Sequence, residues 1–164
     1  SIQQLKSGTN IVGELPIHLK VRDGSEWKKN KDQILNYCIQ EMNKKDNKNV
    51  VILHDGASCF KDVGKDLKRL IKDKTVIEYP SNEGKKKDIQ NIKDFIEKDD
   101  HILFTKTEYF NGCEASNIVY LNYYGSGIRN SLMRGVKNLI LVDVDNYTKI
   151  SGMKEDKRFY WTKL

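Results

Sequence analysis

The sequence has few of the residues that mark extracellular, zinc-binding or disordered proteins. It holds three cysteines, an odd number, and no two of them form a Cys-x-x-Cys pair. This count and spacing argue against a disulfide framework and against a zinc site. Only two prolines occur among 164 residues and no low-complexity tract is present, so long disordered linkers are not expected. The composition is typical of a reduced, intracellular globular protein.

Membrane and export signals are missing as well. No apolar run approaches the roughly 20 residues that a helix needs to cross a bilayer. Residues 1–6 lack the apolar core of a signal peptide, and the chain does not begin with methionine. We therefore expect a processed or excised piece of a cytoplasmic or nuclear protein that has no membrane partner.

The net charge is positive, +6 at neutral pH, with 29 Lys and Arg residues against 23 Asp and Glu residues. Positive charge favours polyanionic partners, chiefly through neutralisation of phosphate groups. Many of the lysines stand beside an acidic residue in helical segments, as in Lys61-Asp62 and Lys93-Asp94. Such mixed surfaces are usually solvated, so the charge leaves both a nucleic-acid partner and an ordinary surface open.

Apolar runs and helical patterns alternate along the chain. The runs predict strands at residues 15–21, 50–53, 75–79, 101–105, 118–121 and 139–144. Strands separated by helices predict right-handed crossovers and one sheet of parallel strands. The predicted fold class is therefore α/β, a three-layer sandwich with a mainly parallel sheet. We expect a single domain over residues 1–164, in which residues 150–164 form a tail on the sheet edge or on an absent neighbour.

The helical segments carry predictions of their own. Ser25 is the predicted N-cap of the first helix, because serine accepts a hydrogen bond from the first turn. The second helix is predicted to present Phe60 and Ile71 on one apolar side. The third helix begins with three lysines and is predicted to bury an apolar stripe of Ile89, Ile92, Phe95 and Ile96.

Functional sites of parallel sheets lie at the carboxyl ends of the strands. This rule places His54-Asp55, Thr105–Glu114, Asn122–Gly127 and Asp143–Asp145 on one rim. No phosphate-binding loop of the form G-x-x-x-x-G-K-[ST] occurs anywhere in the sequence. Without that loop and an acidic ligand for Mg²⁺, the chain alone cannot assemble phosphoryl transfer.

Two short motifs stand in the second half of the chain, separated by a strand. The first is Thr105-Lys-Thr-Glu-Tyr-Phe-Asn-Gly112-Cys-Glu114, and the second is Asn130-Ser-Leu-Met-Arg134-Gly-Val-Lys-Asn138 before an apolar strand. This order resembles the C-terminal RecA-like domain of superfamily 1 helicases of the UvrD-like and Schlafen-like kinds. Their T…KGLE…V and V-x-TRA-x-x-x-L-x-L patterns stand in these places.

The resemblance implies one half of an ATPase. ATP and Mg²⁺ would be bound only in a full-length context, between this domain and an N-terminal RecA-like domain that the chain lacks, and none by this domain alone. An arginine finger falls on Arg134, and further nucleotide contacts fall on Gly112 and Glu114. Contacts to a nucleic-acid strand fall on Thr105 and Thr107.

Two departures from the family pattern support an alternative. Asn111 stands where the family has Lys, and Cys113 where it has Leu. They favour a degenerate helicase module without enzymatic activity, used for sensing or for protein interaction. Whether the domain belongs to an active enzyme is therefore open at the level of sequence.

Lys85, Lys86 and Lys87 form the third candidate feature, a run of positive charge at the start of a predicted helix. Cations are unfavourable at that end of a helix dipole, so a bound phosphate backbone would explain them. A solvated charge run is the alternative. Nucleic acid, DNA or RNA, is thus an expected partner that the domain alone binds weakly.

A different chemistry is suggested by Asp143-Val-Asp145 at the end of the last predicted strand. Two carboxylates after an apolar strand are suited to Mg²⁺, and a Mg²⁺-dependent nuclease could recruit Asp55 or Glu114 as a further ligand. Aspartates at strand ends also commonly form turns.

Overall fold

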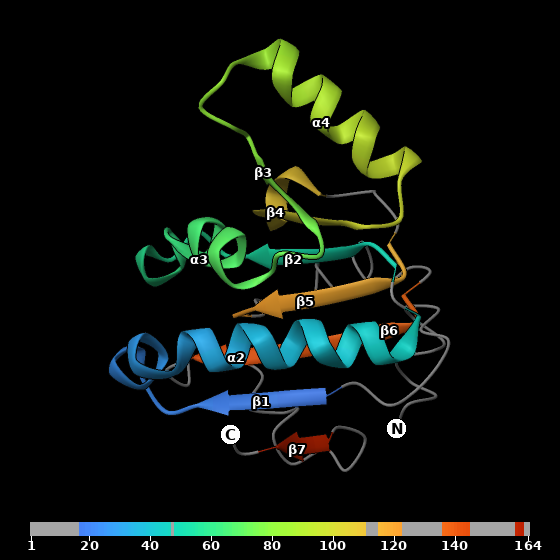
Figure 1. The fold of residues 1–164 in the computed structure, drawn as a ribbon. Helices are drawn as coiled ribbons and strands as arrows, with labels where there is room; N and C mark the ends of the chain where they lie inside the picture. The colour runs from blue at the N-terminus through green and yellow to red at the C-terminus, as the bar shows by residue number, and fades with distance from the viewer. Residues whose placement is uncertain (1–16, 47, 111–114, 123–135, 145–159, 163–164) are drawn as a thin grey trace.

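The computed structural model describes residues 17–46, 48–110, 115–122, 136–144 and 160–162 (Figure 1). Its strands are β1 (Ile17–Val21), β2 (Val50–His54), β3 (Thr75–Tyr79), β4 (His101–Lys106), β5 (Asn117–Leu121), β6 (Asn138–Val144) and β7 (Tyr160–Thr162). Its helices are α2 (Gly24–Lys45), α3 (Val63–Leu70) and α4 (Lys85–Glu97), with short 3-10 turns η1 (Ser58–Phe60) and η2 (Thr107–Tyr109). Each of the predicted strands is present, within two residues of its predicted bounds.

The strands form one sheet in the order β3-β4-β2-β5-β6-β1-β7, and every neighbouring pair is parallel. The predicted three-layer α/β class with a mainly parallel sheet is confirmed. Helices α2 and α3 cover one face of the sheet, and α4 lies by the β3–β4 end, packed on the other face (Figure 1). Strands β2, β5 and β6 are buried along nearly their whole length, which explains why each is a continuous apolar run.

Three asparagines connect the starts of the strands at the amino edge of the sheet. Asn117, fully buried at the start of β5, donates from Nδ2 to Asp46 Oδ1 at 2.7 Å and to the Asn49 carbonyl at 3.2 Å. Asn138, its register partner on β6, donates to Asn117 Oδ1 at 2.8 Å. The Asn49 side chain in turn accepts from the His101 amide at 2.8 Å, where β4 begins. One network thus fixes the starts of four adjacent strands.

The first helix begins at a different cap from the one predicted. Asp23, not Ser25, is the N-cap: its Oδ1 accepts from the Glu26 amide at 2.8 Å, and its backbone is extended. Glu26 accepts from the Arg22 amide at 2.7 Å, which secures the residue before the cap. Aspartate and serine are about equally good caps, so the sequence alone could not rank two candidates that stand two residues apart.

The second predicted helix is divided. Phe60 belongs to the short turn η1, and α3 begins only at Val63 and ends before Ile71. Phe60 is nevertheless buried, with its ring edge-on to Trp27 at a centroid distance of 5.2 Å. The apolar spacing was therefore correct about burial and wrong about a continuous helix.

The apolar stripe predicted for α4 is only half buried. Ile92 and Phe95 pack against the core, whereas Ile89 and Ile96 are 66% and 76% exposed. The reason lies in Asp88, whose carboxylate accepts from the Ser81 amide at 2.9 Å and takes a buried position. Residues four and seven positions after Asp88 share its side of the helix, so the remaining two isoleucines turn outward.

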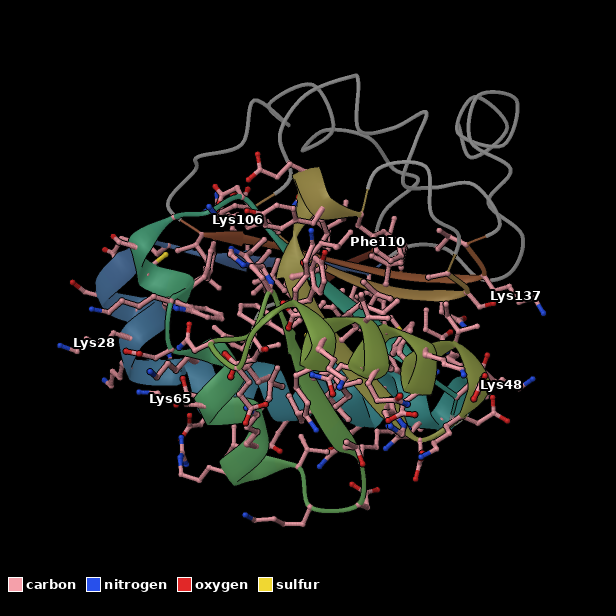
Figure 2. All side chains as sticks on the ribbon, turned by 90° about the horizontal axis from the view of Figure 1, so that it is seen from above. Lys28, Lys48, Lys65, Lys106, Phe110 and Lys137 are labelled. Atoms are coloured by element: carbon pink, nitrogen blue, oxygen red, sulfur yellow. The ribbon has the colours of Figure 1, made fainter. Side chains whose placement is uncertain are left out.

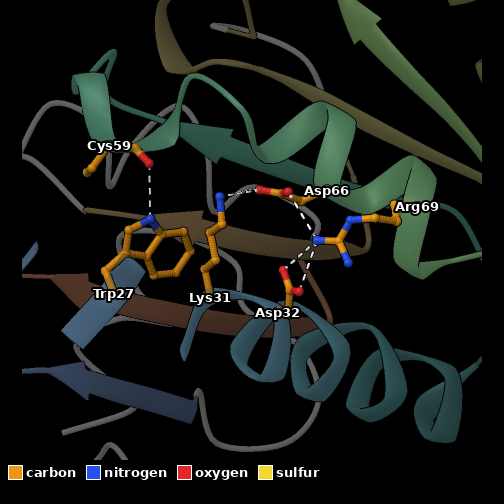
Figure 3. Close-up of polar contacts among 6 residues, drawn as sticks. All are labelled: Trp27, Lys31, Asp32, Cys59, Asp66 and Arg69. Carbon is orange, nitrogen blue, oxygen red and sulfur yellow. Dashed lines mark hydrogen bonds and ion pairs between the residues drawn. The ribbon is translucent and has the colours of Figure 1, made fainter. Parts of the chain in front are cut away.

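Polar contacts join α2 to α3 across the top of the core (Figure 3). Arg69 binds both carboxylate oxygens of Asp32, at 2.8 and 2.9 Å, and Asp66 at 3.2 Å. Asp66 also pairs with Lys31 at 2.9 Å, and the Trp27 indole donates to the Cys59 carbonyl at 3.0 Å. These contacts hold the two helices that cover this face in a fixed relation to each other.

Replacing Asn117 by alanine should destabilise the protein. The change leaves the Asn138 amide and Asp46 without their buried partner, which should lower the free energy of unfolding by about 2–3 kcal/mol. Chemical denaturation followed by circular dichroism measures this difference. Asn82→Ala, at an exposed loop position, is the matched control and should stay within about 0.5 kcal/mol of wild type. Equal stability of the two variants would contradict the role given to the network.

Candidate functional site

The carboxyl ends of β3, β4, β2 and β5 meet at one rim because these strands are all parallel. Helix α4 follows β3 and therefore begins at the same rim. Of the predicted site residues, the structure places Thr105, Thr107 and the three lysines of α4 here. Gly112, Glu114, Arg134 and Asp145 lie outside the described residues.

The two threonines are occupied in holding the rim together. Thr105 is buried, and its hydroxyl donates to the Tyr79 carbonyl at the end of β3, at 2.9 Å. The Thr107 hydroxyl lies 3.1 Å from the His54 carbonyl and 2.7 Å from the Tyr120 hydroxyl. Thr107 thus bridges the ends of β2 and β5. Both threonine hydroxyls are used in hydrogen bonds that hold the strand ends together.

His54 is the most strongly perturbed titratable group on the rim. Its ring stacks on Phe104 at a centroid distance of 4.6 Å, and its Nδ1 accepts from the Gly56 amide at 3.1 Å. Burial, and then the nearby positive charge of Lys106, lower the pKa of His54 from 6.5 to about 4. Gly56 has a positive φ of 90°, and a side chain there would touch Lys106. At neutral pH the site therefore holds an uncharged imidazole beside a lysine.

Asp55 and Asn122 form the next part of the rim. Asp55 Oδ1 accepts from the Ala57 amide at 2.9 Å, and its carboxylate also contacts the Asn122 side chain. Burial raises the pKa of Asp55, while these hydrogen bonds oppose the rise. Asn122 has a φ of 58° and accepts from the Val144 amide at 2.8 Å, which fastens β5 to the end of β6.

The start of α4 combines positive side chains with helix amides. Lys85, Lys86 and Lys87 are exposed, follow Gly84 at a positive φ of 98°, and occupy the first turn, where amides lack helical partners. The contact of Asp88 with the Ser81 amide fixes the preceding loop against this turn. The arrangement is suited to an anion such as a phosphate.

Other lysines do not gather at the rim. Lys28, Lys48, Lys65 and Lys137 are exposed and lie apart around the outline of the molecule (Figure 2). Lys106 stands at the rim itself. These four lysines therefore belong to a mixed, solvated surface, and the first turn of α4 carries the longest run of consecutive lysines among the described residues.

Asp143 does not lie open at the rim. It is fully buried beside an equally buried His18, with 3.8 Å between Oδ2 and Nε2. Among the described residues, no three His, Cys, Asp or Glu side chains form a group that could hold a metal ion. The structure therefore gives the Mg²⁺-dependent nuclease no support from Asp143 or Asp55.

Sequence reasoning passed over Lys106 and the asparagine network. Each of the three asparagines stands directly before an apolar run, at Asn49-Val50, Asn117-Ile118 and Asn138-Leu139. That recurrence was a usable signal, because an amide side chain at a strand start can satisfy the backbone of its neighbour. Lys106 gave no such signal, because its effect on the pKa of His54 depends on the pairing of β4 with the neighbouring strand β2.

No protein-family model matches the sequence, and no curated protein matches it either. Solved structures do match. The C-terminal domain of a possible DNA helicase from Lactobacillus plantarum superposes with a TM-score of 0.61 at 15% identity, over 98% of this chain and 96% of that one. S. cerevisiae Dbp5, bound to RNA and ADP with BeF3, superposes with a TM-score of 0.61 at 13% identity. That match covers 93% of this chain and 41% of the Dbp5 chain, so this chain spans less than half of Dbp5. The similarities establish a RecA-like α/β fold of the kind found in helicase C-terminal domains.

None of the helices in the described residues is long and apolar enough to cross a membrane.

The imidazole of His54 should titrate near pH 4 in an NMR experiment. Because the pKa is below its unfolded value, the unfolded chain takes up the proton more readily, and stability falls as pH drops from about 6.5 to about 4. Lys106→Gln removes the repulsive charge and should raise the His54 midpoint. Lys137→Gln, at an exposed position, should leave it unchanged. A wild-type midpoint near 6.5 would contradict the described environment.

Proposed function

We propose that the chain is the second RecA-like half of a helicase-type ATPase, which completes a nucleotide site and contacts a nucleic-acid strand. The observation that carries this proposal is the match of nearly the whole chain to a helicase C-terminal domain. The missing phosphate-binding loop agrees with it, because in such a pair that loop belongs to the first domain. The chain alone should therefore hydrolyse no ATP.

Support for the two ligand classes comes from the second neighbour. Dbp5 was solved with RNA and with ADP and BeF3, and it shares the fold of this chain. DNA or RNA, and ATP with Mg²⁺, are therefore the ligands that we propose for the complete protein. Within the helicases, the motifs favour a UvrD-like or Schlafen-like member, and that assignment is a prediction from sequence.

The proposed nucleotide contacts are Gly112, Glu114 and Arg134, and they rest on the two sequence motifs. In this proposal Arg134 stabilises charge on the transferred phosphate, while Gly112 and Glu114 contact the nucleotide.

The alternative function is a module without catalytic activity, used for sensing or for protein interaction. It is favoured by Asn111 and Cys113, which replace the Lys and Leu of the helicase motif. The sequence of the complete protein distinguishes the two. A phosphate-binding loop in a preceding domain supports a motor, and its absence supports the module.

Arg134→Ala should abolish most ATP turnover in a protein that joins this chain to its first domain. Arginine fingers contribute about 10³–10⁵ in kcat, so a loss of about 10³ or more is expected, with little change in KM. Steady-state phosphate release measures it. Arg129→Ala removes a neighbouring guanidinium from the same segment and should keep most activity. Equal losses in both variants, or ATP hydrolysis by the isolated chain, would contradict the proposal.

Charge reversal at the start of α4 should weaken nucleic-acid binding. Lys85, Lys86 and Lys87→Glu should lower oligonucleotide affinity and flatten its salt dependence, since each lost phosphate contact on a single strand removes about 0.7 from the slope of log K against log salt. Fluorescence anisotropy at several salt concentrations gives both quantities.

The matched control for this experiment reverses Lys28, Lys29 and Lys65, which are exposed on α2 and α3 and produce the same change of net charge. Similar losses in the two triple variants would show that only net charge matters. If the wild-type protein does not bind the oligonucleotide even at low salt, the proposed contact with a nucleic-acid strand is wrong.

A further inference from the structure

Strand β3 forms one edge of the sheet, and only β4 pairs with it. The Thr75 amide donates to the Asp100 carbonyl at 2.9 Å, and the Tyr79 carbonyl accepts from the Thr105 hydroxyl at 2.9 Å. Thr75 and Tyr79 therefore direct their backbone groups toward β4. In an extended strand the backbone groups of successive residues point to alternate sides. The amides and carbonyls of Val76 and Glu78 thus point away from the sheet, and no backbone partner for them occurs in the described part of the chain.

These outward groups face an open pocket of about 540 Å³. Strand β3 forms its floor, and the loop at residues 80–83 closes the end where β3 terminates. Lys68 of α3 borders it on one face of the sheet, and Lys87 and Asn91 of α4 border it on the other. Figure 1 shows β3 running between these two helices. Five residues at about 3.3 Å each give roughly 16 Å of edge, enough for one short extended segment.

We propose that this pocket, the β3 groove, binds an extended peptide segment of a partner protein as an additional strand. A peptide backbone presents donors and acceptors in alternation, so it can satisfy both the amides and the carbonyls of Val76 and Glu78. Phosphate groups are acceptors only, so a nucleic-acid strand bound through its phosphates would leave both carbonyls unsatisfied. The groove also carries the carboxylate of Glu83, which opposes a bound phosphate.

The charges around the groove indicate which residues the bound peptide should carry. Lys68 is neutralised by Glu78, 2.8 Å away, so the middle of the groove has little net charge. Lys87 lines the groove beside the loop at residues 80–83, and neither it nor Lys85 and Lys86 before it on α4 forms an ion pair with any described residue. A β-forming segment with acidic residues at the end beside Lys87 therefore matches this surface.

A second copy of the chain fits the groove less well than a single peptide. Helices border β3 on both faces and the loop blocks one end, which leaves space for one strand. The β3 edge of another folded copy would bring its own helices α3 and α4 against these walls. The occupant that the groove favours is therefore an isolated extended segment.

Hydrogen exchange measured by NMR tests this proposal. The probe is a decapeptide of alternating Val and Thr with two Glu residues at each end. Its addition should slow exchange of the Val76 and Glu78 amides, while the amides of Thr75, Ile77 and Tyr79, which already face β4, change little. The same peptide N-methylated at alternate residues carries methyl groups on its pairing side, which keep its carbonyls from approaching β3, and should give no protection.

Two variants of one residue separate backbone pairing from side-chain effects. Glu78→Pro removes the outward amide, and Glu78→Thr keeps it, while both lose the ion pair with Lys68. Peptide affinity by fluorescence anisotropy should fall about tenfold or more in Glu78→Pro relative to Glu78→Thr. Thermal melts establish that both variants are folded, and oligonucleotide binding should be equal in the two.

Three results would overturn the proposal. The first is peptide addition that leaves the exchange of Val76 and Glu78 unchanged. The second is protection of these amides without peptide that grows with protein concentration, which would assign the edge to a second copy. The third is equal protection by an oligonucleotide, which would assign it to nucleic acid. None of these outcomes bears on Arg134, so the proposed function is tested independently.

Discussion

The network of Asn49, Asn117 and Asn138 is the interaction on which the arrangement of the sheet depends. Parallel strands must all begin at one edge, yet their starts are contributed by segments far apart in the chain. Backbone groups at buried strand starts also need partners, because an unsatisfied one costs about 1–3 kcal/mol. Amide side chains meet both demands, since each carries donors and an acceptor. They connect the first residues of β4, β2, β5 and β6 to one another, and this connection fixes the register of the central strands.

The opposite edge of the sheet is organised differently. At the carboxyl rim, side chains support loops: Thr107 bridges β2 and β5, and Asn122 fastens β5 to β6. A rigid amino edge and a loop-bearing rim thus arise from the same parallel topology. This division allows a site to vary without disturbing the core.

The fold could be predicted from sequence because its signals are local and redundant. A strand covered on both faces must be a continuous apolar run, as Val50–Leu53 is, so its position is visible without its neighbours. The orientation of α4 was not visible, because it depends on a contact between Asp88 and the Ser81 amide. The N-cap at Asp23 could not be identified from sequence, because Ser25 is an equally good capping residue. Of the predicted site residues, the lysines of α4 and the threonines lie at the rim, and their binding roles stay predictions; Lys106, whose effect depends on the adjacent strand, was missed.

The hydrogen bonds made by the two rim threonines limit how this domain could bind a nucleic-acid strand. The Thr105 hydroxyl is committed to the Tyr79 carbonyl, and that of Thr107 to the His54 carbonyl and Tyr120. Within the part of the rim that the structure describes, the features left for a polyanion are the cationic first turn of α4, with its open amides, and Lys106. Contacts of this kind bind phosphate and carry no information about base sequence. A nucleic-acid strand bound here, as proposed, would therefore be held by its backbone.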